Sequence, residues 1–251
     1  MAGAALVTGA GKRIGRTMAL RLAKAHFDVA VHYRSSRADA EDVVSRIKKT
    51  GGKAIAVQAD LSNEQETAAL IGKVNNGLGP LTLLVNSASV FENDDINSMT
   101  RDSWDKHIET NLRAPLKLAQ DFAAQTEPHA NNLIVNIIDQ RVLKLTPQFL
   151  SYTVSKAALF TLTKTLAQAL GPQGIRVNAI GPGPVMKNPR QSEQGWQKQN
   201  AATVLKQGAR PDDVAGALLY LISATAVTGQ MIAVDGGQHL AWQTPDVLVK
   251  E

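Results

Sequence analysis

The chain has 251 residues, with no cysteine and five histidines, and its 27 lysines and arginines outnumber its 22 aspartates and glutamates to give a formal net charge of +5. Without cysteine there is no disulfide and no thiolate chemistry, and the scattered histidines lack metal-ligand spacing, so metal catalysis is not expected. No apolar run reaches the roughly 18 residues of a membrane span, and no charged-then-apolar leader opens the chain. A cytoplasmic protein without a membrane segment is expected.

Basic residues are spread along the chain without a basic tail or run. This distribution favours small phosphorylated ligands over nucleic acid. Alanine-rich segments of helical length alternate with short runs of Val, Ile and Leu, which is typical of repeated βαβ units. We therefore expect one α/β domain over residues 1–251, with a doubly wound parallel sheet flanked by helices.

A glycine-rich turn follows the first predicted strand, residues 4–8. It runs from Gly9 through Lys12, Arg13 and Ile14 to Gly15, ahead of a helix predicted over 17–25. Glycines allow close approach of a ligand to the backbone, and free N–H groups at a helix start attract a pyrophosphate. An ordinary tight turn is the alternative, but the position favours a dinucleotide.

The second strand, 28–32, ends in His32, Tyr33, Arg34 and Ser35. Units that prefer NAD usually carry an acidic residue here for the ribose 2′-hydroxyl. A basic and hydroxylated segment instead suits a 2′-phosphate, to which Lys12 or Arg13 could add charge. NADP(H) is therefore predicted, against the alternative that Arg34 and its neighbours are solvated loop charges.

Two further strands, 54–58 and 81–85, deliver polar or small residues to the same edge of the sheet. Asp60 follows the first of them and could accept from an adenine amino group, while Asn63 or Ser62 could simply cap the next helix. After the second strand come small residues that leave room for a nicotinamide ribose, and then Phe91, which is either a core residue or a stacking platform.

A long helix predicted over 100–125 carries Asn111 at its middle, with Pro115 four residues on. Proline cannot donate to the Asn111 carbonyl, so a kink and a freed carbonyl are expected there. This carbonyl could bind a water, or the kink could be purely structural.

The fifth strand, 133–138, ends in Asp139, and the following helix, which ends at Leu170, carries Tyr152 and Lys156. Residues four apart share a helix face, so the lysine ammonium is expected to lower the tyrosine pKa toward neutrality and make it a proton donor or acceptor. Such a pair is common by chance, and only the rest of the chain makes a catalytic role persuasive.

A sixth strand is predicted over 174–180. The polar, glutamine-rich segment after it indicates a mobile lid at about 186–208, with a short helix around Trp196. A helix is predicted to start at Pro211, and a last strand over 229–234. The segment 242–251 could cover the site of a neighbouring subunit or lie free.

Taken together, Thr8-Gly9 through Ile14-Gly15, Asn86 with Ala88, Asn111, Tyr152 with Lys156, and Pro182-Gly183 resemble the short-chain dehydrogenase/reductase family in order and spacing. The resemblance implies a seven-stranded parallel Rossmann-type sheet, hydride transfer from a nicotinamide cofactor, and a homotetramer. It further implies that Tyr152 donates a proton, that Lys156 binds the nicotinamide ribose, and that Asn111 holds a relay water. The cofactor-binding residues implied are Gly9, Lys12, Arg13, Ile14, Gly15, His32, Tyr33, Arg34, Ser35, Asp60, Leu61, Asn86, Ser87, Ala88, Tyr152, Lys156, Pro182, Gly183 and Val185.

Two departures from the family pattern resemble its pteridine reductase branch. Arg13 replaces a usual glycine, and Asp139 replaces the serine that normally assists the tyrosine. The resemblance implies that Arg13 contacts cofactor phosphate and pterin, that Phe91 stacks on the pterin, and that Ser89 hydrogen-bonds substrate or cofactor. Asp139 would then partner Tyr152 in proton delivery, and both would contact the substrate.

Reduction chemistry gives an independent reason for this reading. A carboxylate would repel the alkoxide that forms from a carbonyl, whereas a protonated acid beside a tyrosine can supply the proton that a pterin ring nitrogen gains. An NADPH-dependent reductase of a pterin or dihydropterin is therefore predicted. The alternatives are a carbonyl or 3-oxoacyl-thioester reductase of the same family and a non-catalytic NADP-binding sensor.

Overall fold

The computed structural model describes residues 3–126 and 131–242. Seven parallel strands form one sheet in the order β3-β2-β1-β4-β5-β6-β7, which confirms the predicted Rossmann-type fold. The strands are β1 Ala4–Val7, β2 Asp28–Tyr33, β3 Ala54–Gln58, β4 Leu81–Asn86, β5 Asn132–Ile137, β6 Ile175–Pro182 and β7 Met231–Val234.

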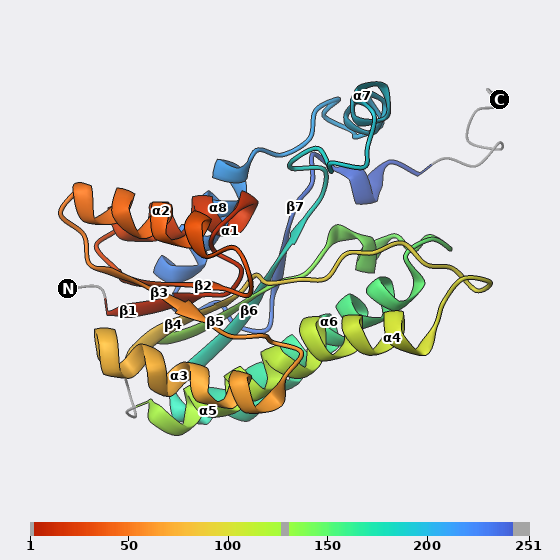
Figure 1. Ribbon diagram of the computed structural model, residues 1–251. Helices are drawn as coiled ribbons and strands as arrows, with labels where there is room; N and C mark the ends of the chain where they lie inside the picture. Colours follow the sequence, from red (N-terminus) through yellow and green to blue (C-terminus); the bar gives the residue numbers. More distant parts are fainter. Residues whose placement is uncertain (1–2, 127–130, 243–251) are drawn as a thin grey trace, which may run out of the picture.

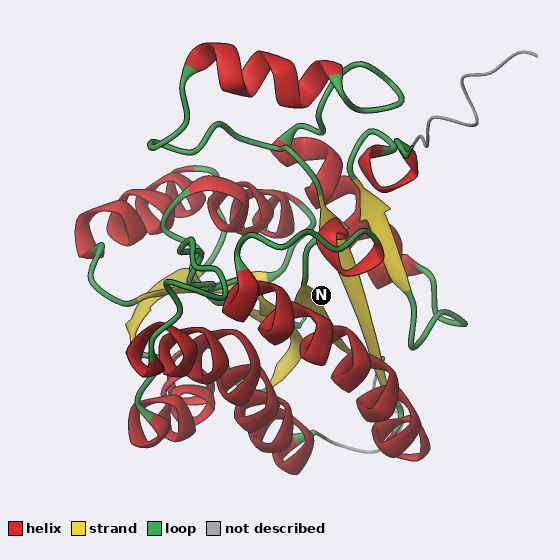
Figure 2. Cartoon of the chain, turned by 90° about the vertical axis from the view of Figure 1, so that its right-hand side faces the viewer, coloured by secondary structure: helices red, strands yellow, loops and turns green. Residues whose placement is uncertain are grey.

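Helices cover both faces of the sheet (Figures 1 and 2). One face carries α1, α2 and α8, and the other carries α3, α4, α5 and α6, while α7 lies beyond the strand ends. The helices are α1 Arg13–Lys24, α2 Arg37–Lys49, α3 Glu64–Leu78, α4 Arg101–Ile108, α5 Ala114–Gln125, α6 Leu150–Leu170, α7 Glu193–Ala201 and α8 Pro211–Ser223. Short 3₁₀ turns follow at η2 Gln140–Leu143, η3 Gly171–Gln173 and η4 Gln238–Leu240.

Alternation along the strands divides the core into two layers. Val7 packs with Met18 of α1 and Leu218 of α8 on one face of the sheet. The preceding residue, Leu6, points to the other face and packs with Phe122 of α5. Each such fully buried side chain stabilises the fold by roughly 1.5–3 kcal/mol, so the two layers fix the sheet on which the site is built.

The single helix predicted over 100–125 is divided in the structure. Between α4 and α5 lies a π-helical turn, η1, Glu109–Arg113. Pro115, in the first turn of α5, has no N–H for the Asn111 carbonyl, so the wider turn replaces the regular helical bonding. At the place of the predicted kink, the structure thus has a π turn.

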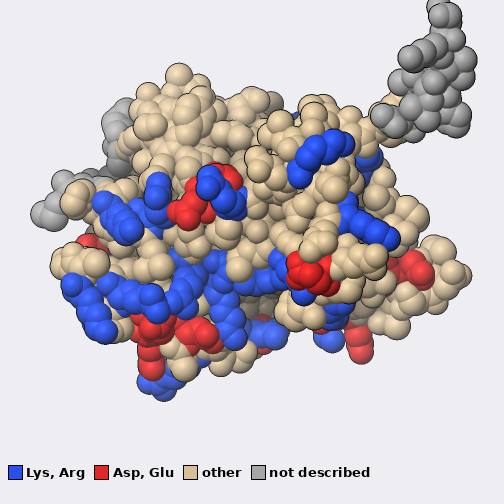
Figure 3. Space-filling view, turned by 90° about the horizontal axis from the view of Figure 1, so that it is seen from above, with Lys and Arg blue, Asp and Glu red and all other residues tan. Residues whose placement is uncertain are grey.

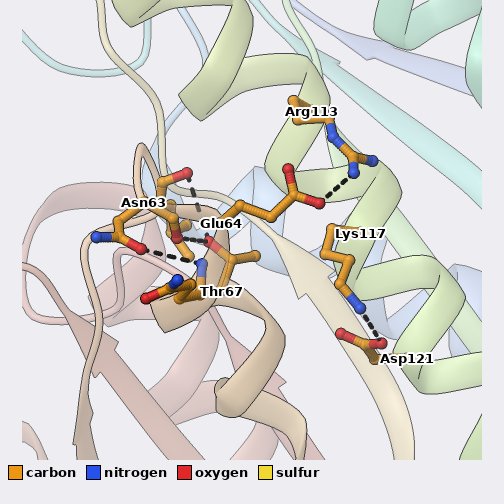
Figure 4. Close-up of polar contacts among 8 residues, drawn as sticks. Asn63, Glu64, Thr67, Arg113, Lys117 and Asp121 are labelled. Carbon is orange, nitrogen blue, oxygen red and sulfur yellow. Dashed lines mark hydrogen bonds and ion pairs between the residues drawn. The ribbon is translucent and has the colours of Figure 1, made fainter.

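The start of α3 is tied to this turn, as Figure 4 shows. Asn63 Oδ1 accepts the N–H groups of Gln65 at 3.0 Å and Glu66 at 3.2 Å, which confirms the predicted cap. Arg113 of η1 then forms an ion pair with Glu64. The π turn is thus held against the first turn of α3.

Candidate active site

Tyr152 lies in the first turn of α6 and reaches Asp139, which follows β5. Its hydroxyl donates to Asp139 Oδ2 at 2.9 Å, and the tyrosine is 5% exposed. Asp139 Oδ1 accepts the backbone N–H of Arg141 at 2.8 Å, so the carboxyl is held from both sides. The structure brings together the two residues that the sequence indicated as a proton-transfer pair.

Lys156 lies one turn further along α6 and is almost completely buried. Its Nζ donates to the Ile137 carbonyl at 2.9 Å and lies 5.8 Å from the centroid of the Tyr152 ring. Burial lowers its pKa to about 8, although the charge of nearby Asp139 favours the ammonium form. The ammonium therefore approaches the tyrosine ring, while the carboxyl of Asp139 binds the hydroxyl.

This arrangement corrects the predicted effect of Lys156 on Tyr152. Burial raises the pKa of Tyr152 well above its usual value, and the charge and hydrogen bond of Asp139 raise it further. Burial also raises the pKa of Asp139, against the lowering effect of the hydrogen bond from Arg141. The predicted fall of the tyrosine pKa is wrong, because a phenolate would lie directly beside a carboxylate.

Asn111, in the π turn, is fully buried and fastens the segment after β4 to α6. Its Oδ1 accepts the N–H of Val90 at 2.8 Å, and its Nδ2 donates to the carbonyl of the same residue at 3.0 Å. Nδ2 also donates to Ser155 Oγ at 3.1 Å. Ser89, exposed, donates from Oγ to Asn111 Oδ1 at 3.1 Å, so this predicted substrate residue lies on the same bonded segment.

Phe91 belongs to an aromatic cluster that includes a residue the sequence reasoning missed. Its ring stacks on Phe149 with centroids 4.5 Å apart and planes at 3°, and meets Tyr152 edge to face at 4.7 Å. The Arg141 guanidinium lies 5.0 Å from the Phe149 centroid. The sequence signal that could have indicated Phe149 is its aromatic ring three positions before Tyr152. Its left-handed backbone, with φ 58°, depends on the tertiary structure and could not be predicted.

The glycine loop is shaped for close backbone approach. Gly9 has φ 65°, and a side-chain carbon there would lie 2.9 Å from Ala88 Cα. A side-chain carbon at Gly15 would lie 2.4 Å from the Gly9 carbonyl oxygen. Within the described residues, no side chain caps the start of α1, whose N–H groups suit a pyrophosphate. Ile14, in this first turn, packs against the core.

His32 supports this loop from beneath. It is 2% exposed, and its Nδ1 accepts the N–H of Gly9 at 3.0 Å. Because an amide nitrogen can only donate, the ring proton is on Nε2, which donates to the Ala59 carbonyl at 3.0 Å. Burial lowers the histidine pKa to about 4. With both ring nitrogens bonded to the backbone, His32 holds the glycine loop in place, and its part in cofactor binding stays a prediction.

The predicted 2′-phosphate residues Arg34 and Ser35 are exposed after β2, beside partly buried Tyr33. Seen from above, lysines and arginines gather on part of the molecular surface, interspersed with aspartates and glutamates (Figure 3). Lys12 pairs with Asp39 at 3.0 Å.

The polar residues after β3 and β4 are held by local hydrogen bonds. Asp60 Oδ1 accepts the N–H of Ser62 at 2.9 Å and its hydroxyl at 2.7 Å, with Leu61 buried between them. Thr8 Oγ1 accepts the N–H groups of Ser87 at 2.8 Å and Ala88 at 2.9 Å. These bonds fix the backbone around the crevice.

Asn86 ends β4 beside this backbone and is almost completely buried. Its Nδ2 donates to Asn136 Oδ1 at 2.9 Å. Its own Oδ1 is buried and finds no hydrogen-bond partner in the described part of the chain. An unpaired buried oxygen at the crevice is available to a ligand donor.

Two arginines bond the segment after β6 to the glycine loop and to Phe91. Arg13, with φ 51°, donates to the carbonyls of Met186 at 2.9 Å and Lys187 at 3.1 Å. Arg190 donates to the Phe91 carbonyl at 2.7 Å. Helix α1 starts at Arg13 and not at residue 17 as predicted. The Arg13 side chain therefore lies next to the glycine loop.

The remaining predicted cofactor residues lead into this segment. Pro182 and Val185 are buried, and a side-chain carbon at Gly183 would lie 2.5 Å from Asp235 Cβ. The short helix predicted around Trp196 is confirmed as α7. Residues 243–251, for which a role over a neighbouring site was considered, lie outside the described residues.

A family model described as enoyl-(acyl carrier protein) reductase matches residues 9–239, nearly the whole chain. The chain belongs to the short-chain dehydrogenase/reductase family. The match spans the glycine loop, Asn111 and the Tyr152–Lys156 helix, so the resemblance inferred from these residues is confirmed at the level of the family.

Relatives within the family are named for different enzymatic activities. The 3-oxoacyl-[acyl-carrier-protein] reductase FabG of Staphylococcus aureus is 33% identical over 244 residues, 96% of this chain and 99% of that protein. FolM alternative dihydrofolate reductase 1 of Brucella suis, solved in complex with NADP, is 43% identical with a TM-score of 0.94, over 98% of this chain and 99% of that one. The Brucella canis FolM complex with NADP is 42% identical with the same TM-score, over 98% and 97%.

Within residues 3–126 and 131–242, no three potential metal ligands gather. In the same part of the chain, no helix has both the length and the apolar character to cross a bilayer.

Proposed function

We propose that this short-chain reductase uses NADPH to reduce a pterin or dihydropterin. The observation that carries the proposal is the 2.9 Å hydrogen bond from the Tyr152 hydroxyl to Asp139 Oδ2. In the family pattern a serine stands in the place of Asp139. A carboxyl there, with its pKa raised by burial, is a suitable proton reservoir, whereas its ionised form would repel a developing alkoxide.

NADP(H) is the cofactor of this enzyme, and the residues present fit it. The uncapped start of α1, the close backbone at Gly9 and the unpaired Asn86 Oδ1 would hold its phosphates and ribose. Arg34 and Ser35 would hold the 2′-phosphate. When bound, the cofactor would supply a hydride.

The chain itself must supply the proton. As the carbon of a ring C=N bond gains hydride, the electron pair of that bond moves to nitrogen, which takes the proton of the Tyr152 hydroxyl. Asp139, when protonated at Oδ2, donates to the Tyr152 oxygen across the same 2.9 Å contact, the reverse of the direction with an ionised carboxylate, and so replaces that proton. Solvent then reprotonates the carboxyl. Neither residue then has to exist as an isolated buried anion, which their raised pKa values disfavour.

Phe91, Ser89 and Arg13 would form the substrate side of the site. The Phe91 ring already stacks on Phe149, so a flat heterocycle would extend this stack or replace Phe149 in it. The Arg13 bonds to Met186 and Lys187 would make the segment 186–208 a lid. These roles are the ones that the resemblance to the pteridine reductase branch implies, and the 43% identity with FolM alternative dihydrofolate reductase 1 supports that branch.

A second function, 3-oxoacyl-thioester reduction, is favoured by one observation. FabG matches 96% of this chain at 33% identity, so the fold and the Tyr152–Lys156 helix suit either substrate. The difference lies in Asp139, whose charge would repel a developing alkoxide unless the carboxyl is protonated.

The deciding experiment follows NADPH oxidation by the purified protein between about pH 5 and about pH 8. A dihydropterin, dihydrofolate and a 3-oxoacyl thioester are supplied side by side. Turnover of the pterin or folate without the thioester is the expected result. Turnover of the thioester alone removes the pterin proposal, and cofactor binding without any turnover favours a sensor.

We further propose that the enzyme is a homotetramer built through the helices that carry Asn111 and Tyr152 and through β7. Val154, on α6, is 41% exposed, and all four residues of the edge strand β7 are only partly buried. Light scattering coupled to size exclusion measures the mass directly, and a monomeric mass would refute the tetramer.

A further inference from the structure

The first turn of α6, which carries Tyr152, is not capped by its own N-cap residue. Phe149 occupies that position with φ 58° and offers no side-chain oxygen. The N–H of Leu150 donates instead to the carbonyl of Asp94 at 3.1 Å, and the N–H of Ser151 donates to Asp94 Oδ1 at 3.0 Å. A residue 57 positions earlier in the chain thus satisfies the helix start.

Asp94 is also the centre of a buried polar cluster. Its Oδ2 accepts the hydroxyls of Ser151 and, at 2.8 Å, of Ser103. Ser151 Oγ lies 2.8 Å from His107 Nδ1. Asp94 is 2% exposed, and both Ser151 and His107 are 0% exposed. A buried carboxylate with this many donors is well compensated, whereas losing one donor leaves charge uncompensated.

The hydrogen-bond directions in the cluster are fixed by one amide. The N–H of Glu92 donates to His107 Nε2 at 3.2 Å, so Nε2 is the acceptor and the ring proton is on Nδ1. Nδ1 then donates toward Ser151 Oγ and the Ser103 carbonyl at 2.8 Å. The Ser151 hydroxyl in turn donates a hydrogen bond to Asp94 Oδ2. The direction of each of these bonds is therefore fixed, and the segment after Phe91 is bonded to the start of α6.

We propose that Asp94, with Ser151 and His107, is a positioning clamp for Tyr152 and Phe91. Glu92 is adjacent to Phe91 and Ser151 is adjacent to Tyr152, so the clamp bonds the immediate neighbours of both rings. It holds the edge-to-face contact at 4.7 Å and thereby the place of the proton donor relative to the substrate platform. The role of Phe91 rests on the proposed function. The role of Tyr152 is the same whether the enzyme reduces a pterin or a 3-oxoacyl thioester.

The test compares Asp94→Asn and Ser151→Ala with Asp95→Asn as the matched control. Asp95, the next residue, uses Oδ1 only for its own turn, where it accepts the N–H groups of Asn97 and Ser98 at 2.9 Å each. Asp94→Asn keeps the shape but loses the charge, and Ser151→Ala removes the hydroxyl while keeping the backbone bond to Asp94.

Single-turnover hydride transfer and NADPH affinity are measured for each variant, together with the kinetic isotope effect of deuterated NADPH. A clamp predicts a rate that falls about ten- to hundredfold, as misplacement of about 1 Å does, with NADPH affinity unchanged and an altered isotope effect. The combined Asp94→Asn and Ser151→Ala variant should lose little more than either alone, because both break one unit. Asp95→Asn should behave as the unaltered enzyme does.

A lowered melting temperature with an unchanged transfer rate and isotope effect would show a purely structural cluster and overturn the proposal. If Asp94→Asn does not fold, Ser151→Ala alone decides. Failure of the proposed function is recognised separately, because the unaltered enzyme would then reduce only the thioester. The same variants are in that case compared on the thioester, where the clamp on Tyr152 makes the same prediction.

Discussion

The Tyr152 hydroxyl is hydrogen-bonded to Asp139 Oδ2 at 2.9 Å, and this pairing sets the electrostatics of the site. Burial raises the pKa of both groups, and the charge and hydrogen bond of Asp139 raise that of Tyr152 further, so the pair retains a proton. Lys156 Nζ lies 5.8 Å from the centroid of the Tyr152 ring. The hydrogen-bond partner of the Tyr152 hydroxyl is therefore Asp139 and not Lys156.

Replacing Asp139 by Asn should reduce turnover of a dihydropterin by at least about a hundredfold, the usual worth of a general acid. Asn preserves the size of the side chain and its acceptor for Arg141, so a loss reports the proton and not the fold. Activity of the unaltered enzyme should fall as pH rises through the raised pKa of Asp139, and this limb should vanish in the variant. Full pterin turnover by Asp139→Ser would show that the assigned roles are wrong.

The affinity for NADPH should depend on the charge of Lys156. Its pKa is lowered to about 8, so the ammonium is present below that pH and is lost above it. If the ammonium binds the nicotinamide ribose, affinity is constant below about pH 8 and weakens above it by about tenfold per pH unit. Titration by fluorescence measures this, with Lys156→Met lacking the dependence and Lys164→Met, on the same helix, retaining it. A flat profile of the unaltered protein would contradict the ribose role.

Replacing Arg34 by Ala should lower the preference for NADPH over NADH. A charge-assisted bond to the 2′-phosphate contributes about 1.5–3 kcal/mol, so kcat/KM for NADPH should fall about ten- to hundredfold while that for NADH is unchanged. Arg37→Ala is the matched control, because Arg37 already pairs with Glu41 at 2.7 Å. Equal losses with both cofactors would place Arg34 outside the phosphate site.

Stability should fall on acidification because of His32. Its pKa is lowered from 6.5 to about 4 by burial, so the folded state binds this proton less readily than the unfolded chain. Its contribution is complete above pH 6.5 and is lost as pH falls toward about 4, at about 1.4 kcal/mol per pH unit. Urea unfolding across this range should show the slope, and His32→Asn should lack this component. An equal slope in both proteins would refute the assignment.

Removing the Arg13 side chain should release the segment 186–208. Arg13→Ala loses the bonds to the Met186 and Lys187 carbonyls, so limited trypsin digestion should cleave at Lys187 faster and kcat/KM should fall about tenfold. Arg16→Ala is the control, because it loses only the surface ion pair with Asp42, which is worth little. Unchanged digestion of Arg13→Ala would show that Arg13 does not hold the lid.

The sequence by itself determined the order of strands and helices, the glycine loop and the Tyr152–Lys156 spacing. These are local properties: apolar runs of strand length, glycines between a strand and a helix, and two side chains one helical turn apart. The proline effect at Asn111 was equally local, since a missing N–H acts on a carbonyl four residues back.

Only the tertiary structure decided which partner each ionisable group meets. Helical spacing placed Lys156 on the same face as Tyr152, but packing against β5 directs its ammonium to the Ile137 carbonyl and Asp139 to the hydroxyl. The aromatic stack of Phe149 and the cap by Asp94 likewise join segments far apart in the chain. Periodicity specifies which face a residue occupies, whereas a pKa depends on burial and on charges a few ångströms away, which long-range packing alone supplies.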